Sequence, residues 1–138
     1  MNPYLHFPDC DCKDAFALYE KVFGAKCVFT ATWADAPAEG RPPGIDGDKI
    51  MHATLQFPDG TLLMGADCPP EYGTPFGGFA LSVNTSDVAD AEAKFAGISE
   101  GGMVTMPLQQ TFWAERFGMC KDRHGVSWMV NCEMRAPK

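Results

Sequence analysis

Two histidines and one glutamate have the residue types that could carry acid–base or metal chemistry in this chain of 138 residues. His6 and His52 each lie in a short run of alternating apolar and polar residues, which predicts a β-strand around each of them. Both take the polar parity of their strand, so we expect both imidazoles on the polar face of a sheet. A pair of imidazoles can serve as general base and general acid near neutral pH. With Glu115, the pair would also form a His-His-carboxylate set for Zn²⁺ or Fe²⁺.

The spacing of these three residues matches no metal-binding motif, so a second interpretation stays open. The two histidines can equally line a polar cavity, hydrogen-bonded to their neighbours, and contact a ligand without turning it over. His124 lies in a Gly-containing turn, where we expect solvent to surround it.

The stretch that should position a ligand is QTFWAERFGMCKDRHGVSWMVN, residues 110–131. It predicts strands over residues 111–120 and 126–132, joined by a turn at residues 122–125. Its aromatic residues either belong to the core or form a wall that stacks on a flat ligand: Phe112, Trp113 and Phe117. Alternation in the last strand separates buried Trp128 from a semi-polar face that carries Met129 and Asn131.

Composition restricts the class of protein. The length suits one domain, and 46% hydrophobic with 21% charged residues is ordinary for a globular protein. The net charge is −7 and basic residues are scattered, which argues against nucleic-acid binding. Hydrophobic runs are too short for a membrane span, and the N-terminus has no secretory signal pattern, so we expect a cytoplasmic protein.

The chain has six cysteines in irregular spacing, which we expect to be reduced thiols. We expect Cys27 and Cys132 in the core, and Cys10 and Cys12 in an exposed loop before a helix.

The remaining elements follow from periodicity and from Gly and Pro. Strands are predicted at residues 4–7, 27–33, 49–57, 61–66, 77–84 and 101–109. Helices are predicted at residues 12–23, capped by Asp9 or Asp11 and ended by Gly24, and at residues 87–96, capped by Thr85 or Ser86. Residues 35–48 form a Pro- and Gly-rich loop, a lid or an interface arm, whose Arg41 could meet an anion.

Each half of the chain therefore has the order β-α-β-β-β, and the halves are similar in detail. FPDGTLLMG (57–65) matches DRHGVSWMV (122–130) around a shared Gly and Met. The order predicts an α+β fold of two modules, about 1–67 and 77–138, with a linker at about 68–76, in which a curved mixed sheet forms a cup. The polar parity of the strands should line its concave side and contact a small ligand. These ligand-binding candidates are Tyr4, Thr54, Gln56, Met64, Trp113, Glu115, Met129 and Asn131, beside His6 and His52 as candidate catalytic residues.

The opening Pro3-Tyr4-Leu5, the Q-x-T-F-W-A stretch and G-V-x-W-M-V-N resemble the PhnB-like branch of the vicinal oxygen chelate superfamily, which includes glyoxalase I, extradiol dioxygenases and bleomycin-resistance proteins. The resemblance implies paired βαβββ modules and a homodimer. Members of the branch often carry a methyltransferase label. A methyltransferase of the usual kind needs a doubly wound sheet and a Gly-rich loop, and residues 4–12 carry no glycine.

The resemblance also implies where a metal would lie. Metal-dependent relatives use one position on the first and one on the last strand of each module, which correspond to Tyr4, Met64, Gly78 and Met129 here. None of these is His, Asp or Glu, and thioethers suit Cu(I) rather than a hard divalent ion. We therefore expect no metal and no other cofactor.

Three hypotheses for function follow. The first is a metal-free protein that binds a small, possibly aromatic molecule. The second is a metal-dependent lyase or isomerase that uses His6, His52 and Glu115. The third is a non-catalytic structural or interaction dimer whose cavity is filled by side chains.

Overall fold

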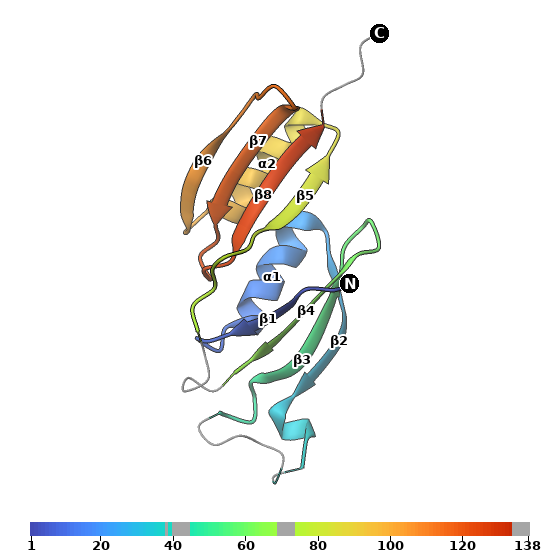
Figure 1. Ribbon diagram of the computed structural model, residues 1–138. Helices are drawn as coiled ribbons and strands as arrows, with labels where there is room; N and C mark the ends of the chain where they lie inside the picture. The colour runs from blue at the N-terminus through green and yellow to red at the C-terminus, as the bar shows by residue number, and fades with distance from the viewer. Residues whose placement is uncertain (38, 40–44, 69–73, 134–138) are drawn as a thin grey trace. The chain divides into compact units, whose positions relative to one another are not determined.

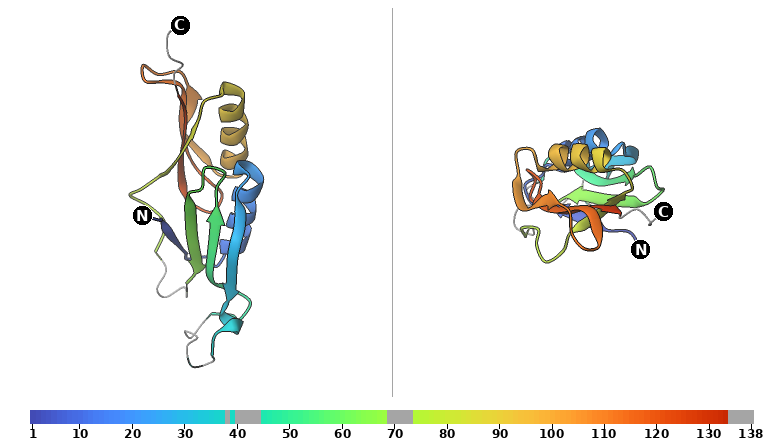
Figure 2. Two further views of the ribbon diagram at one scale, coloured as in Figure 1. Left: turned by 90° about the vertical axis from the view of Figure 1, so that its right-hand side faces the viewer. Right: turned by 90° about the horizontal axis from the view of Figure 1, so that it is seen from above.

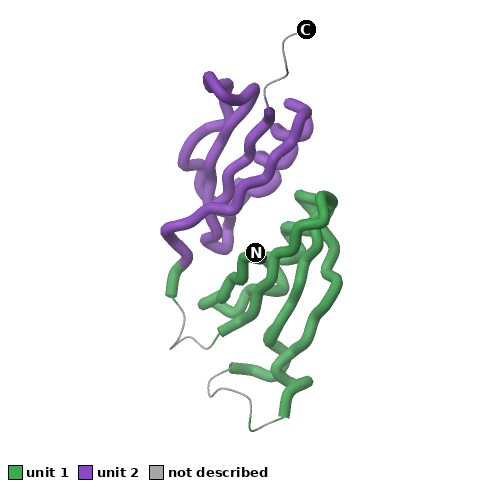
Figure 3. Tube along the Cα trace, turned by 45° about the vertical axis from the view of Figure 1, so that its right-hand side comes forward, with its two compact units in different colours: residues 1–75 green, residues 76–138 purple. Residues whose placement is uncertain are grey.

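The computed structural model describes residues 1–37, 39, 45–68 and 74–133, so Arg41 and part of its loop lie outside the described residues. The chain divides into two compact units, residues 1–75 (unit 1) and residues 76–138 (unit 2) (Figure 3). Each unit contains a four-stranded mixed sheet and one longer helix in the order β-α-β-β-β (Figure 1). The predicted α+β fold of two βαβββ modules is confirmed.

Unit 1 has its sheet in the order β1-β4-β3-β2. β1 runs parallel to β4, and the other two pairs are antiparallel. The elements are β1 (Tyr4–Phe7), α1 (Cys12–Phe23), β2 (Lys26–Thr32), the 3-10 turn η1 (Trp33–Asp35), β3 (Ile50–Gln56) and β4 (Leu62–Asp67). β1 and α1 have the bounds predicted from sequence.

Unit 2 repeats this plan, with the sheet order β5-β8-β7-β6 and β5 parallel to β8. Its elements are β5 (Leu81–Thr85), α2 (Val88–Ser99), β6 (Met103–Gln109), β7 (Ala114–Lys121) and β8 (Ser127–Glu133). In each unit the helix covers one face of its own sheet (Figure 2). We call the opposite face of that sheet the distal face.

One glycine in each sheet lets the helix approach closely. A Cβ on Gly65 would lie 2.9 Å from the ring of Phe16 in α1, and a Cβ on Gly118 would lie 2.8 Å from the ring of Phe95 in α2. The alternate residues of β1 agree with this packing, since Leu5 and Phe7 are buried and the Phe7 ring meets Phe16 edge-on at 6.0 Å. These contacts between helix and sheet therefore determine which alternate residues of each strand face the helix.

The start of α1 is held by a residue distant in sequence. Asp11 is the N-cap residue, one of the two predicted, and Gly24 ends the helix with the left-handed φ of 71°. The backbone N–H of Cys12, however, donates to the carboxylate of Asp67 at 2.9 Å. The other oxygen of Asp67 accepts the N–H of Ile50 at 2.8 Å. One buried carboxylate thus joins the end of β4 to the starts of α1 and β3.

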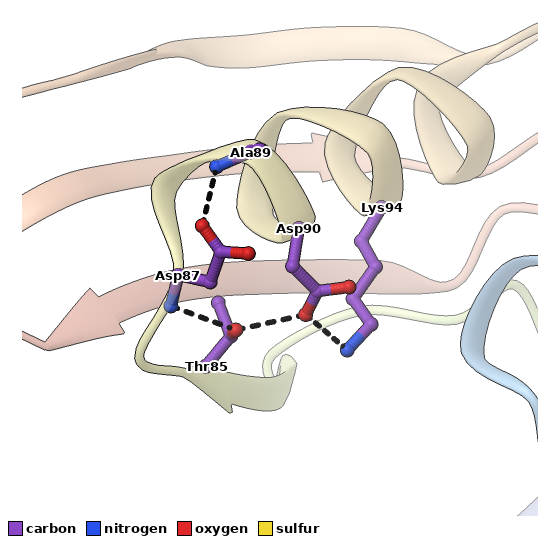
Figure 4. A network of polar contacts seen from close by, with 5 residues as sticks. All are labelled: Thr85, Asp87, Ala89, Asp90 and Lys94. Carbon is purple, nitrogen blue, oxygen red and sulfur yellow. Dashed lines mark hydrogen bonds and ion pairs between the residues drawn. The ribbon is translucent and has the colours of Figure 1, made fainter.

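The start of α2 is held by a local network (Figure 4). Asp87 is the N-cap and accepts the N–H of Ala89 at 3.1 Å, whereas the sequence favoured Thr85 or Ser86 for this role. Thr85 instead donates its hydroxyl to Asp90 at 2.8 Å and accepts the N–H of Asp87. Asp90 also pairs with Lys94 at 2.6 Å. These hydrogen bonds, with Lys94 first, lower the pKa of Asp90.

Two predicted strands begin three or more residues later than expected. β5 starts at Leu81 instead of residue 77, so Phe79 lies outside the sheet and is exposed. β7 starts at Ala114 instead of residue 111, because the N–H of Thr111 donates to the carbonyl of Ala114 and closes a turn.

The cysteines carry free thiols, but two of their positions were predicted wrongly. Cys27 is exposed on the edge strand β2, and Cys12 is fully buried in the first turn of α1. Cys132 is buried as predicted. Burial raises the pKa of Cys12 strongly and the pKa of Cys120 to about 11, so both thiols stay protonated at neutral pH.

Replacing Asp67 by Ala should lower the free energy of unfolding by about 2–4 kcal/mol, because two buried N–H groups lose their acceptor. Urea denaturation of the full chain measures the change. The matched control is Asp59→Ala, which removes a carboxylate bonded only within an exposed turn and should cost less than about 1 kcal/mol. Equal losses in the two variants would contradict the role assigned to Asp67.

Candidate functional site

The distal face of unit 1 carries a hydrogen-bonded chain of three side chains from β1 and β3. The Tyr4 hydroxyl lies 3.0 Å from Nδ1 of His52, and Nε2 of His52 lies 3.1 Å from the hydroxyl of Thr54. A neutral imidazole has one N–H donor and one acceptor nitrogen, and either hydroxyl can take either role. The chain Tyr4–His52–Thr54 is therefore satisfied in both directions, which suits the movement of a proton along it.

His6 and His52, predicted on the polar parity of their strands, lie on this same face. The Tyr4 ring stands beside both, with centroids 5.0 Å from His6 and 5.4 Å from His52. The cross-strand row that contains Tyr4 continues through Met64 to Thr54. The structure thus brings together Tyr4, His6, His52, Thr54 and Met64, while Gln56 lies exposed at the end of β3.

Phe29 also belongs to this group, and sequence reasoning missed it. A register shift between Cys27 and Phe29 sets Phe29 opposite Thr54, on the distal face. Its ring is half exposed and lies 5.7 Å from that of His52. The alternation of apolar and polar residues does not reveal a bulge. The sequence therefore predicted only a strand at residues 27–33, without the face that Phe29 takes.

Burial raises the pKa of the Tyr4 phenol, and the nearby Cys12 adds to the shift. The folded protein therefore favours the neutral phenol above the usual pH of its ionisation. Tyr4 acts as a hydroxyl donor or acceptor throughout the neutral range, and not as a phenolate.

The distal face of unit 2 is built from two adjacent cross-strand rows. One row runs from Ser82 through Met129 and Met119 to Met106, and all three methionines are half-buried. The other runs from Asn84 through Asn131 and Phe117 to Gln109. The face is therefore a thioether surface with an aromatic ring and amides beside it.

An aromatic cluster (Phe112, Trp113 and Phe117) adjoins these rows at the start of β7. The Trp113 ring lies 4.8 Å from Phe112 and 5.4 Å from Phe117, in both cases edge to face. Phe117 is buried, whereas Phe112 and Trp113 are 90% and 49% exposed. Phe117 is therefore buried within the distal face, and the other two rings face solvent.

Trp113 and Glu115, both predicted at the site, take different positions from those that a regular strand gives. Trp113 lies before β7 in a turn, where Thr111 Oγ1 accepts the N–H of Ala114 at 3.1 Å. Glu115 lies at a register shift between Ala114 and Arg116, so its parity does not follow from alternation. Glu115 belongs to unit 2, and the two histidines belong to unit 1.

The positions that hold a metal in relatives must be reassigned in one case. Tyr4 pairs with Met64, and the equivalent residue paired with Met129 is Ser82, because Gly78 precedes β5. In unit 1 these positions carry a phenol and a thioether, and in unit 2 a hydroxyl and a thioether. Neither pair fits a hard divalent ion, which prefers carboxylate, imidazole or carbonyl ligands.

Over residues 1–37, 39, 45–68 and 74–133, no group of three or more His, Cys, Asp or Glu side chains is arranged to hold a metal ion. Across those same ranges, each helix is too short or too polar to cross a bilayer.

Comparison with known proteins gives a consistent result. The model of the glyoxalase/bleomycin resistance protein/dioxygenase superfamily matches residues 3–130. Protein YjdN of Escherichia coli is 30% identical over 99% of this chain and 97% of its own length. The crystal structure of protein PA1353 from Pseudomonas aeruginosa is 41% identical, with a TM-score of 0.86 over 98% of both chains. A PhnB protein from Bacillus cereus, described as a putative 3-demethylubiquinone-9 3-methyltransferase, shares the fold at 20% identity, with a TM-score of 0.73 over 96% of both chains.

The raised pKa of Tyr4 gives a pH prediction. In an absorbance titration at 295 nm, the signal that Tyr4→Phe removes from the wild type should develop only above pH 10. The reason is that burial disfavours the charged phenolate. Ionisation of that tyrosine below pH 10 would contradict the environment described for it.

Proposed function

This chain belongs to the glyoxalase/bleomycin resistance protein/dioxygenase superfamily, and we propose that it binds a small, planar organic molecule without the divalent metal of its metal-dependent relatives. The observation that carries the proposal is the distal face of unit 2. There half-buried Met119 and Met129 adjoin Phe117, and the exposed ring of Trp113 stands at the edge.

The chemistry of this face suits a flat, apolar ligand. An exposed indole gains free energy by stacking or edge contact with a second ring. Thioether sulfurs also contact aromatic rings favourably, and the flexible Met side chain adapts to ligands of different outline. An apolar surface with a few polar groups at its margin is the usual composition of a small-molecule site.

Unit 1 carries a separate polar surface on its own distal face. The hydroxyls of Tyr4 and Thr54 lie on its distal face at the two ends of the His52 imidazole, with Met64 in the row between them. Gln56 adds an exposed amide to this surface, and Glu115 is the carboxylate candidate of unit 2. The groups of unit 1 would hydrogen-bond a polar ligand on the distal face of that unit.

Titration with 5-nitroindole, a flat non-fluorescent quencher, should quench tryptophan emission and saturate. Trp113→Ala should weaken the binding at least about tenfold, because an aromatic anchor is lost. The matched control Trp33→Phe removes an indole from η1 and should keep the affinity. Unchanged binding in the Trp113 variant, or absence of saturable binding in the wild type, would refute the proposal.

The second candidate function is the metal-dependent lyase or isomerase that uses His6, His52 and Glu115. The Tyr4–His52–Thr54 chain favours acid–base chemistry, because it links two hydroxyls through an imidazole. The donor set at the four metal positions opposes it.

Metal content separates the two functions. If the chain is a metal-free binding protein, the protein purified without chelators should contain far less than one divalent ion per chain. The lyase or isomerase requires stoichiometric metal that His52→Ala removes, and elemental analysis of both proteins decides the question.

We further propose a cytoplasmic homodimer. Edge strands β2 and β6 expose Val28, Phe29, Met103 and Val104. Unpaired edges that carry apolar side chains favour association with a second chain. The third hypothesis, a purely structural dimer, predicts the same association without any ligand binding.

A further inference from the structure

The amide of Asn131 has an unused acceptor. Its Nδ2 donates to Oδ1 of Asn84 at 3.3 Å, which joins β8 to β5 across the distal face of unit 2. Its own Oδ1 is buried and has no hydrogen-bond partner. Buried side-chain oxygens in native proteins nearly always accept a hydrogen bond, so we expect a donor group at this atom.

The side chains around this oxygen are mainly apolar. Asn131 stands opposite Phe117 in the cross-strand row, and Met129 and Met119 form the next row on the same face. A bound water molecule normally needs two to four polar partners, and Phe117 and the two methionines offer none. The adjacent polar side chains on this face are Asn84, whose Oδ1 already accepts from Asn131, and Glu133, whose carboxylate provides acceptors.

We propose that the ligand carries an N–H or O–H donor on its ring and presents it to Oδ1 of Asn131. Its ring system rests on Phe117 and the two methionines. The ligand class is thus a phenol, an indole-like heterocycle or an aromatic amide, and not a plain hydrocarbon or an alkylated analogue. This inference rests on the proposed function and assigns the polar half of the same site.

A hydrogen bond from the ligand to Oδ1 of Asn131 would give strong selectivity between ligands with and without a donor. A site built to pair with an O–H or N–H rejects the analogue that lacks it, because the buried acceptor then stays unpaired. Methylation removes the donor and adds bulk at the point of contact. The cross-strand row that contains Asn131 ends in a second amide. Gln109 stands opposite Phe117 in that row and is exposed to solvent. Gln109 provides the matched comparison for Asn131.

The experiment measures the affinities of 2-naphthol and 2-methoxynaphthalene for the full chain by isothermal titration calorimetry. Wild type should bind 2-naphthol at least about tenfold more tightly than its methyl ether. Asn131→Leu should bring the ratio of the two affinities close to one. Gln109→Leu should leave the ratio as in the wild type.

The outcomes separate this inference from the proposed function. Equal binding of both compounds by the wild type, or tighter binding of the ether, overturns the donor assignment and leaves a planar-ligand site standing. An unchanged ratio in Asn131→Leu overturns the choice of residue. Binding of neither compound overturns the proposed function together with the inference. Equal or reversed affinities in the wild type overturn the inference even if the Asn131 variant does not fold, which a thermal melt reveals.

Discussion

A buried carboxylate that binds backbone N–H groups holds each unit together at the end of a strand. Asp67 accepts from the first turn of α1 and from the start of β3. In unit 2, Asp122 accepts the N–H groups of His124 and Val126 and the indole N–H of Trp128. Burial raises the pKa of Asp67 while its hydrogen bonds oppose the shift, so the cost of burying this charge is offset by the donors that it orders.

Asp67 lies in the strand pair whose register arranges the distal face of unit 1. Asp67 stands opposite Phe7 in the parallel pair of β1 and β4, and the same pairing places Tyr4 beside Met64. A slip of one residue would turn Tyr4 toward α1 and Leu5 toward the distal face. The close contacts of Phe16 with Gly65 and of Phe95 with Gly118 oppose such a slip, because another residue there would collide with the helix.

Local patterns predicted the elements, and long-range contacts explain the errors. Periodicity and a C-terminal Gly sufficed for α1, and alternation placed His6 and His52 on one face. The capping of Cys12 by Asp67 spans 55 residues, so no local pattern could contain it. The bulge beside Phe29, the late start of β5 and the turn before Ala114 each depend on which strand is the neighbour, and alternation within one strand does not carry that information.

Under the proposed function, a face that lacks a divalent ion must select its ligand by other forces. A divalent ion attracts oxygen atoms of almost any small molecule, so metal sites discriminate mainly through the rest of the cavity. Here the corresponding residues are Tyr4, Met64, Ser82 and Met129, which offer two hydroxyls and two polarizable sulfurs. Such groups act only at short range and in defined directions. Selectivity must then come from the shape of the apolar surface and from the few unpaired polar atoms beside it, and on unit 2 the oxygen of Asn131 is such an atom.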